Sequence, residues 1–150
     1  MNKTLSGIIL AADTLLRSGR TYPKAIVETA VAEYMRRQPD YRYGELFSGV
    51  IEGDASTIVL DQISHKVLDI TFDGELVRAT VEIADTPHGK VVNDRLNEQA
   101  PDAMPMFGLS LRGIGKLTDG VVTGYRIVSV ALVPYMDSFE YEWQKKSAEK

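Results

Sequence analysis

Two Asp-Gly turns constrain the fold of this chain more than any other feature of its sequence. They are Asp73-Gly74 and Asp119-Gly120. Each lies between two apolar runs of strand length: 63–72 and 76–83, then 106–117 and 121–133. Glycine accepts the positive φ of a tight turn, so each pattern predicts a β-hairpin. Strands joined by hairpins are antiparallel, which argues against a doubly wound parallel sheet.

Helices are added to these hairpins. After Pro23, apolar residues recur every three or four positions, which predicts an amphipathic helix that Pro39 ends. A second helix is predicted to start at Thr86-Pro87 and to continue through 91–96. Further strands are predicted over 6–16, 45–51 and 58–61. The mixture predicts an α+β class or a small antiparallel β-barrel with packed helices.

Length and charge limit the function classes. A chain of 150 residues can bury about two thirds of its unfolded surface. We expect one domain over 1–150, with a charged tail over about 140–150. The net charge of -4 argues against nucleic-acid binding. No apolar run approaches the ~20 residues of a membrane helix, and no secretory signal pattern is present. We therefore expect an intracellular protein that contacts neither nucleic acid nor membrane.

Few residues are suited to bind a metal. Cysteine is absent, and His65 and His88 are the two histidines. Two such ligands are too few for a zinc site, and the acidic residues show no calcium-loop spacing. We expect no metal and no cofactor. Strand alternation places His65 on one face with Ile63 and Val67, which favours a buried core histidine.

The glycine-bracketed segment 108–115 is the most unusual string in the chain. Alternation places Ser110 and Arg112 on one face and two leucines on the other. This pattern fits an exposed nucleophile beside an oxyanion-stabilising group, but the same pair is common on the solvent face of a half-buried strand. Gly113 and Gly115 are interpreted as relieving crowding in a bent strand.

Five motifs over roughly residues 5–137 carry a family resemblance. They are Arg20-Thr21-Tyr22-Pro23-Lys24, Tyr43-Gly44-Glu45-Leu46, Ile63-Ser64-His65, Ala84-Asp85-Thr86-Pro87-x-Gly89-Lys90 and Gly108-Leu109-Ser110-Leu111-Arg112-Gly113-x-Gly115. In these motifs and their order the chain resembles the prohead core serine proteases of tailed bacteriophages. The resemblance implies a fold like that of herpesvirus assemblins, a small β-barrel with helices around it. It also implies a role in head maturation, in which scaffold and capsid proteins are cleaved inside the prohead.

The resemblance also implies a catalytic site, which this chain matches in part. Ser110 matches the family's nucleophile, and Arg112 the residue that supports the oxyanion. The family's catalytic histidine lies in a Gly-Glu-Leu-x-His-Pro string, and Ser48 stands at that position here. Ala131 stands where the late strand of the family carries an aspartate, which we expect to orient the base. A serine hydroxyl is a poor nucleophile without a neighbouring base, so a degenerate site is predicted.

Three hypotheses follow. The first is a non-catalytic, prohead-protease-like component of a phage head, which binds capsid or scaffold protein in the prohead or virion, assembled in the host cytoplasm. The second is an active serine endopeptidase in which His65, or a recruited Asp137 or lysine, takes the proton of Ser110. The third is a binding domain with a ligand that the sequence does not identify. A homo-oligomer is compatible with each of them. The aromatic segment 135–143 fits either a partner contact or the domain's own core.

Overall fold

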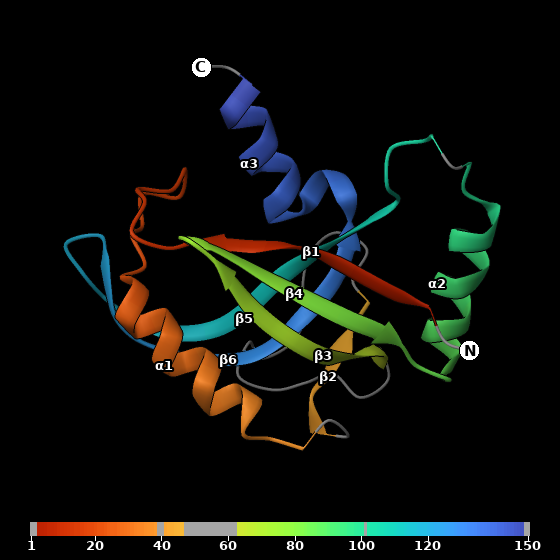
Figure 1. The fold of residues 1–150 in the computed structure, drawn as a ribbon, viewed down its shortest axis with the longest axis horizontal. Helices are drawn as coiled ribbons and strands as arrows, with labels where there is room; N and C mark the ends of the chain where they lie inside the picture. Colours follow the sequence, from red (N-terminus) through yellow and green to blue (C-terminus); the bar gives the residue numbers. More distant parts are fainter. Residues whose placement is uncertain (1–2, 39–40, 47–62, 101, 149–150) are drawn as a thin grey trace.

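Strands dominate the structure of this chain (Figure 1). The computed structural model describes residues 3–38, 41–46, 63–100 and 102–148. The elements in these ranges are β1 (Thr4–Ala11), α1 (Lys24–Met35), β2 (Tyr43–Glu45), β3 (Ile63–Asp73), β4 (Leu76–Ile83), α2 (Pro87–Glu98), β5 (Phe107–Thr118), β6 (Val121–Pro134), the 3-10 helix η3 (Tyr135–Asp137) and α3 (Phe139–Ala148). The predicted mixture of helices and antiparallel strands is confirmed.

The described strands form two antiparallel sheets. The larger has the order β1-β4-β3-β2, and the smaller is the hairpin β5-β6. Both predicted hairpins are present, and their turns use the positive φ expected of them: 62° at Gly74, 51° at Asp119 and 82° at Gly120. The turn chemistry of the sequence therefore fixes both hairpins.

The two sheets meet on one side. A parallel bridge joins Leu46, which follows β2, to Leu132 of β6. On the other side β1 lies next to β5, and a Cβ built on Gly7 would be 3.7 Å from Leu109 Cδ1. No ladder joins β1 to β5 in the described ranges. The strands thus form two sheets joined along one side, rather than the closed barrel that was predicted.

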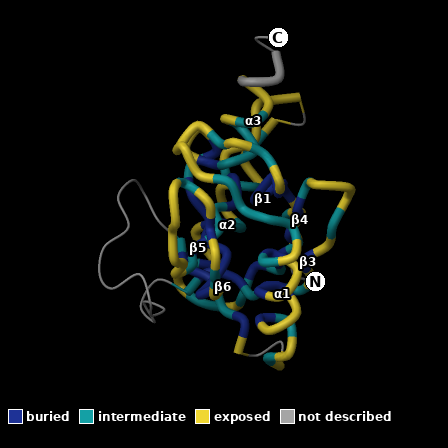
Figure 2. The backbone as a smooth tube through the Cα atoms, turned by 90° about the vertical axis from the view of Figure 1, so that its left-hand side faces the viewer, coloured by how far each residue is buried: buried dark blue, intermediate teal, exposed yellow. Residues whose placement is uncertain are grey.

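The core lies between the sheets and beneath α1. Figure 2 shows buried backbone through the middle of the strands and exposed backbone at the turns and on α3. The buried residues of α1 follow the predicted helical stripe: Val27, Ala30, Val31 and Tyr34. Pro23 precedes this helix as expected, whereas Pro39 lies outside the described residues.

An arginine that the sequence analysis did not single out connects α1 to β3. Arg42 is buried, and its guanidinium donates to the carbonyls of Arg37 at 2.7 Å and Val67 at 2.9 Å. The last carbonyls of a helix have no partner within the helix. Arg42 supplies one, because its guanidinium also donates to Met35 O at 3.4 Å, and it thereby holds the end of α1 against the sheet.

The predicted start of α2 is confirmed in detail. Thr86 caps the helix, because its hydroxyl accepts from Gly89 N at 3.0 Å and donates to Ile63 O at 2.6 Å. Pro87 occupies the first helical position, where its missing N–H is not needed. A Cβ on Gly89 would lie 1.9 Å from Ala84 O, so the chain enters the helix too tightly for any side chain there.

Two predicted strands differ from the structure. The strand predicted over 6–16 ends at Ala11, because Asp13 turns the chain with a φ of 55° and its carboxylate accepts from Lys24 N at 2.9 Å. The strand predicted over 45–51 starts earlier, since β2 is Tyr43–Glu45 and Leu46 forms an isolated bridge, and its residues 47–51 lie outside the described residues. The predicted strand 58–61 lies outside the described residues.

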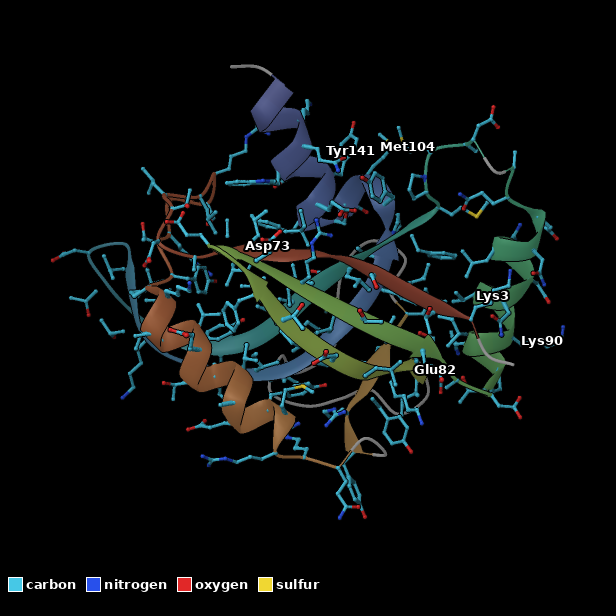
Figure 3. The ribbon with its side chains drawn as sticks, viewed as in Figure 1. Lys3, Asp73, Glu82, Lys90, Met104 and Tyr141 are labelled. Atoms are coloured by element: carbon cyan, nitrogen blue, oxygen red, sulfur yellow. The ribbon has the colours of Figure 1, made fainter. Side chains whose placement is uncertain are left out.

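The predicted tail contains a helix. Tyr141, labelled in Figure 3, lies on α3 and meets the ring of Tyr135 edge-on at 5.7 Å. Trp143 stacks on Phe139 at 5.9 Å. The described part of this segment therefore docks on the domain through its aromatic residues. No helix among the described residues is long and apolar enough to cross a membrane.

Candidate functional site

The β5-β6 hairpin sets the position of the candidate nucleophile. Ser110 pairs with Ala131, and Arg112 pairs with Ser129 two residues further along the same face. Leu109 and Leu111 alternate with them and pack in the main core, where Leu109 is buried and Leu111 is partly buried. The predicted alternation of Ser110 and Arg112 against two leucines is therefore confirmed.

Arg112 is not exposed beside Ser110. Its side chain is buried and forms an ion pair with Glu45, which is itself fully buried at the end of β2. Ser129 donates to the second carboxylate oxygen of Glu45 at 2.8 Å. We call Glu45, Arg112 and Ser129 the buried polar cluster. The expectation of a solvent-exposed serine and arginine pair is wrong for the arginine, because Glu45 from another strand draws it into the interior.

That Arg112 supports an oxyanion stays a prediction, and its ion pair with Glu45 limits how it could do so. A guanidinium bound to a buried carboxylate is held by charge-assisted hydrogen bonds and does not turn freely toward a neighbouring residue. Any contribution to an oxyanion next to Ser110 would have to come from the rest of the arginine or from the strand that it fixes. Within this cluster Arg112 joins β5 to β2.

His65 is a fully buried residue of β3 with both ring nitrogens occupied. Nδ1 lies 2.7 Å from the hydroxyl of Ser64, and Nε2 lies 2.6 Å from the carbonyl of Val130. A carbonyl can only accept, so Nε2 carries the proton and Nδ1 accepts from Ser64. Burial lowers the pKa of His65 from 6.5 to about 4, which keeps the ring neutral. The expected core histidine is confirmed.

These contacts do not support His65 as a substitute base for Ser110. A general base needs an available lone pair within hydrogen-bond reach of the proton that it removes. In His65 that lone pair is on Nδ1 and accepts from Ser64. Because the ring binds β6 at Val130, it connects the two sheets and is not directed at the serine.

Gly44 explains part of the Tyr43–Leu46 motif. A Cβ at this position would lie 2.0 Å from His65 Nε2 and 2.3 Å from Val130 O. Glycine is required there because β2 passes directly over the hydrogen bond that joins β3 to β6. The next residue, Glu45, then enters the buried polar cluster. Gly44 and Glu45 therefore both contribute to the region where the two sheets meet. We call this region the junction; it comprises the buried polar cluster and the contacts of His65 with Gly44 and Val130.

Ser110 is half-buried and has no hydrogen-bonded side chain in the described part of the chain. Directly opposite residues of an antiparallel pair have Cβ atoms about 5 Å apart on one face, so a carboxylate at position 131 would lie next to the serine. The methyl group of Ala131 offers no such contact. Ser48 lies outside the described residues, and its assignment to the family's base position stays a prediction.

A pocket of about 280 Å³ borders Ser110. Its walls come from β1, β5, the turn that follows β1, and α3. The lining residues include Leu10, Arg17, Tyr22, Leu111, Tyr125 and Trp143. Burial raises the pKa of the Tyr125 phenol, which packs edge-on against Tyr22 at 5.4 Å. The pocket next to the candidate nucleophile therefore combines aromatic and aliphatic side chains with the charged residues Arg17, Arg20 and Glu142.

The glycines of β5 have the role that was predicted for them. A Cβ on Gly113 would lie 2.3 Å from the hydroxyl oxygen of Tyr125, and one on Gly115 would lie 2.9 Å from Gly124 O. The register of the hairpin also shifts at Gly113. The two glycines thus let Tyr125 and β6 approach a bent strand.

Sequence reasoning missed three polar residues at this junction: Glu45, Ser129 and Ser64. Glu45 belonged to a motif that was already recognised. An acidic residue directly after a glycine in a predicted strand was the available signal that its side chain is buried. The partners of Glu45 are 67 and 84 residues away in the chain. No local pattern specifies such pairing. In the described ranges, no group of three or more acidic residues or histidines could hold a metal ion.

Comparisons with known proteins place the chain among protease-like proteins of phage heads. The family model described as "Prohead core protein serine protease" matches residues 2–134. The chain belongs to this family. The match ends at the last residue of β6, so α3 lies beyond it.

One protein sequence and one solved structure, both from bacteriophage T4, are similar to this chain. The prohead core protein protease of Enterobacteria phage T4 is 30% identical over 127 residues, which cover 83% of this chain and 56% of that protein. The chain thus spans little more than half the length of this relative. The solved structure of the bacteriophage T4 capsid assembly protease superposes with a TM-score of 0.69 at 25% identity, covering 87% of this chain and 80% of that one.

Proposed function

We propose that this chain is a non-catalytic component of a tailed-phage head, which binds capsid or scaffold protein in the prohead or virion. The observation that carries the proposal is the state of His65, whose two ring nitrogens are bound to Ser64 and Val130. No side chain among the described residues is hydrogen-bonded to Ser110, and the lone pair of His65 is taken by Ser64. Ser48, at the position of the family's histidine, has no imidazole to accept the proton of Ser110.

Loss of the catalytic histidine would reduce proteolysis far more than it would reduce the binding of partner proteins. Removing the histidine of a Ser-His-Asp unit costs about 10⁶ in turnover, leaving the contributions of binding and of the oxyanion site. A head protein with such a site would still present the family's surface to its partners. Family membership supports the phage-head role, and we place assembly in the host cytoplasm on the same ground.

We also propose that residues 1–150 form a single domain related to the small barrel of herpesvirus assemblins. The bridge between Leu46 and Leu132 and the hydrogen bond from His65 to Val130 support this, because both continue the larger sheet into the β5-β6 hairpin. The adjacency of β1 and β5 would complete the circuit. The homo-oligomer considered from the sequence stays a prediction.

The competing function is an active serine endopeptidase that cleaves scaffold and capsid proteins with Ser110 as nucleophile. Family membership and the pocket beside Ser110 favour it. It would need a proton acceptor from outside the described residues, or a rearrangement that frees His65 from Ser64. Asp137, the other candidate considered, lies at the exposed end of η3.

The test uses the purified full chain with the scaffold and capsid proteins of the same phage. Sedimentation velocity measures complex formation, and mass spectrometry of the mixture measures cleavage. We expect a complex and intact partner proteins, both for the native chain and for Ser110→Ala. Cleavage by the native chain that Ser110→Ala abolishes would establish the endopeptidase.

A gain-of-function variant examines the same proposal from the opposite direction. Ser48→His, alone and with Ala131→Asp, restores the residue types of the family at its two missing positions. We expect Ser110-dependent cleavage to appear in at least the double variant. The matched control is the same double variant with Ser110→Ala, which should remain inactive.

A further inference from the structure

A second pocket, of about 380 Å³, lies at the end of the ladder between β1 and β4. This ladder ends where Ala11 pairs with Leu76. Both residues line the pocket, together with Thr14, Gly74, Glu75 and Trp143. Figure 1 shows the turn between β3 and β4 beside the end of β1, with α3 above them. None of the described lining residues comes from β5 or β6, so this pocket is formed separately from the one that borders Ser110.

Main-chain contacts hold Glu75 in place at this pocket. The turn that precedes it has a φ of 62° at Gly74, and Glu75 O accepts from Ala12 N at 2.7 Å. That hydrogen bond joins the β3–β4 turn to the segment after β1. The side chain of Glu75 is exposed, and its carboxylate forms no ion pair with a described residue. The pocket therefore has a carboxylate that is free to bind a cation from outside the described part of the chain.

Thr14 supplies a second acceptor. Its hydroxyl donates to Ala12 O at 3.1 Å, which leaves the lone pairs of its oxygen available to accept. Among the described residues that line this pocket there is no lysine or arginine. The pocket beside Ser110 differs in this respect, because Arg17 and Arg20 line it. The ligand chemistry that complements the second pocket is consequently a cationic hydrogen-bond donor.

Trp143 forms the aromatic wall of the second pocket. Its ring stacks on Phe139 at an interplanar angle of 16° and a centroid distance of 5.9 Å. Phe139 lines the pocket beside Ser110 but not this one, so the second pocket borders a part of the indole that Phe139 does not cover. Aromatic faces attract cations, and tryptophan does so most strongly. Ala11 and Leu76 add apolar surface for the methylene groups of a long cationic side chain.

Arginine fits this combination of groups better than lysine does. Its planar guanidinium stacks on aromatic rings and binds a carboxylate through two parallel hydrogen bonds. The ammonium of lysine is a compact, strongly hydrated point charge without that geometry. Arginine is also enriched at protein interfaces. The net charge of -4 favours association with a partner surface that carries basic groups.

We propose that the second pocket binds an arginine side chain of a partner protein. The guanidinium packs against Trp143 and is bound by the carboxylate of Glu75, while the hydroxyl of Thr14 accepts a further hydrogen bond. The methylene groups of the arginine lie on Leu76. The inference rests on the proposed function for the identity of the partner, which would be a capsid or scaffold protein. The affinity of the pocket for a guanidinium does not depend on that identity.

The probe is N-acetyl-arginine amide, titrated into the full chain and followed by NMR. We expect it to shift the indole N–H signal of Trp143 and the amide signals of Gly74 and Glu75, because these groups border the pocket. Trp143 is the only tryptophan, so its indole signal is unambiguous. Absence of these shifts would overturn the proposal.

Two other amides examine the chemistry of recognition. N-acetyl-citrulline amide has nearly the same shape as the probe without its charge, and it should leave the three signals unchanged. If it binds as tightly as the probe, the pocket selects apolar shape and the proposal is wrong. N-acetyl-lysine amide should bind more weakly than the probe, and equal affinities would overturn the assignment to arginine.

A pair of charge variants locates the binding site. Glu75→Gln removes the carboxylate and should weaken binding of the probe about fivefold, as expected for the loss of a partly exposed ion pair. Asp73→Asn is the matched control, because it removes the same charge from the same turn. Asp73, labelled in Figure 3, does not line the pocket, and this variant should bind like the native chain. Equal affinities for the native chain and Glu75→Gln would contradict the proposal.

The same variants separate this proposal from the proposed function. If head proteins bind and Glu75→Gln weakens their binding, both proposals are supported. If head proteins bind the native chain and Glu75→Gln equally well, the pocket does not contact them, and the proposed function stands without this inference. If the probe binds in a manner that depends on Glu75 while head proteins do not bind, the pocket is an arginine site, and the proposed partners are wrong.

Discussion

The junction between the two sheets, formed by the buried polar cluster and by His65 with Val130, differs from the contact between β1 and α3 in how its polar groups are satisfied. At the junction, Glu45 binds two side chains in the interior, and both nitrogens of His65 are bonded at 2.7 Å or less. Between β1 and α3, the N–H of Ile8 donates to Glu140 Oε1 at 3.4 Å. The first region is held by short bonds between buried groups, whereas this second contact is one long, partly buried bond. We therefore expect substitutions at the junction to cost more stability than substitutions at the contact between β1 and α3.

The largest effect is expected at the buried polar cluster. Glu45→Ala should lower the free energy of unfolding by about 3–5 kcal/mol, because it leaves the Arg112 guanidinium buried without its carboxylate. Urea denaturation followed by circular dichroism measures the change. If the junction is the more firmly held region, Glu140→Ala, which removes the contact between α3 and β1, should cost much less.

The matched control replaces both charges at once. Glu45→Leu combined with Arg112→Met removes the ion pair without leaving a buried charge, and such replacements are often neutral or stabilising. We expect this double variant to be clearly more stable than Glu45→Ala. A double variant that unfolds as easily as the single one would show that the cluster holds the sheets together by more than its charges.

Much of the fold could be predicted because its signals are local. The Asp-Gly turns specify both hairpins, and Thr86-Pro87 specifies the start of α2. The end of β1 could not be predicted in this way, since the apolar run continues beyond Ala11. It is set by Asp13, whose carboxylate caps the following helix from eleven residues away. Whether the strands close into a barrel likewise depends on distant pairings such as Leu46 with Leu132.

A smaller loss is expected when β2 is pushed away from the junction. Gly44→Ala places a methyl group against His65 Nε2 and Val130 O. We expect a loss of about 3 kcal/mol from overpacking and from weakening a buried hydrogen bond. Gly124→Ala is the control, because its Cβ would meet nothing within 4 Å. Equal stability of the two variants in urea denaturation would mean that the junction adapts.

The pH dependence of stability gives the next effect in size. The folded pKa of His65 is about 4, below its ordinary 6.5, so the unfolded chain binds the proton more strongly. The contribution to stability is complete above pH 6.5 and is lost as the pH falls toward 4. Between pH 7 and pH 5 we expect a loss of about 2 kcal/mol.

Two variants attribute this pH dependence to the junction. In His65→Gln the loss between pH 7 and pH 5 should be reduced by most of that amount, although the variant is less stable at both values. His88→Gln leaves the junction intact and should keep the dependence of the native chain. Urea denaturation midpoints at pH 7 and pH 5 measure this dependence for each variant. If the stability of His65→Gln still falls steeply between these pH values, another group causes the pH dependence.

The candidate site divides in the same way between local and distant information. The apolar pattern of the 108–115 segment placed Ser110 on a strand, as the structure has it, but it did not predict the pocket beside that serine. It could not show that Arg112 turns inward, because Glu45 is 67 residues away. Nor could spacing reveal that Ser64, the neighbour of His65, binds the lone pair that a base would need.

The smallest effect is expected at Ser110 itself. Its hydroxyl has no hydrogen-bonded side chain in the described ranges, and the residue is half-buried, so Ser110→Ala should change the free energy of unfolding by less than about 0.5 kcal/mol. A serine that forms part of an assembled hydrogen-bond unit would cost about 1 kcal/mol or more, since its partner would be left unsatisfied. Urea denaturation at pH 7 resolves the two cases. A loss above 1 kcal/mol would indicate a hydrogen-bond partner for the Ser110 hydroxyl, and the comparison with the junction would then have to include it.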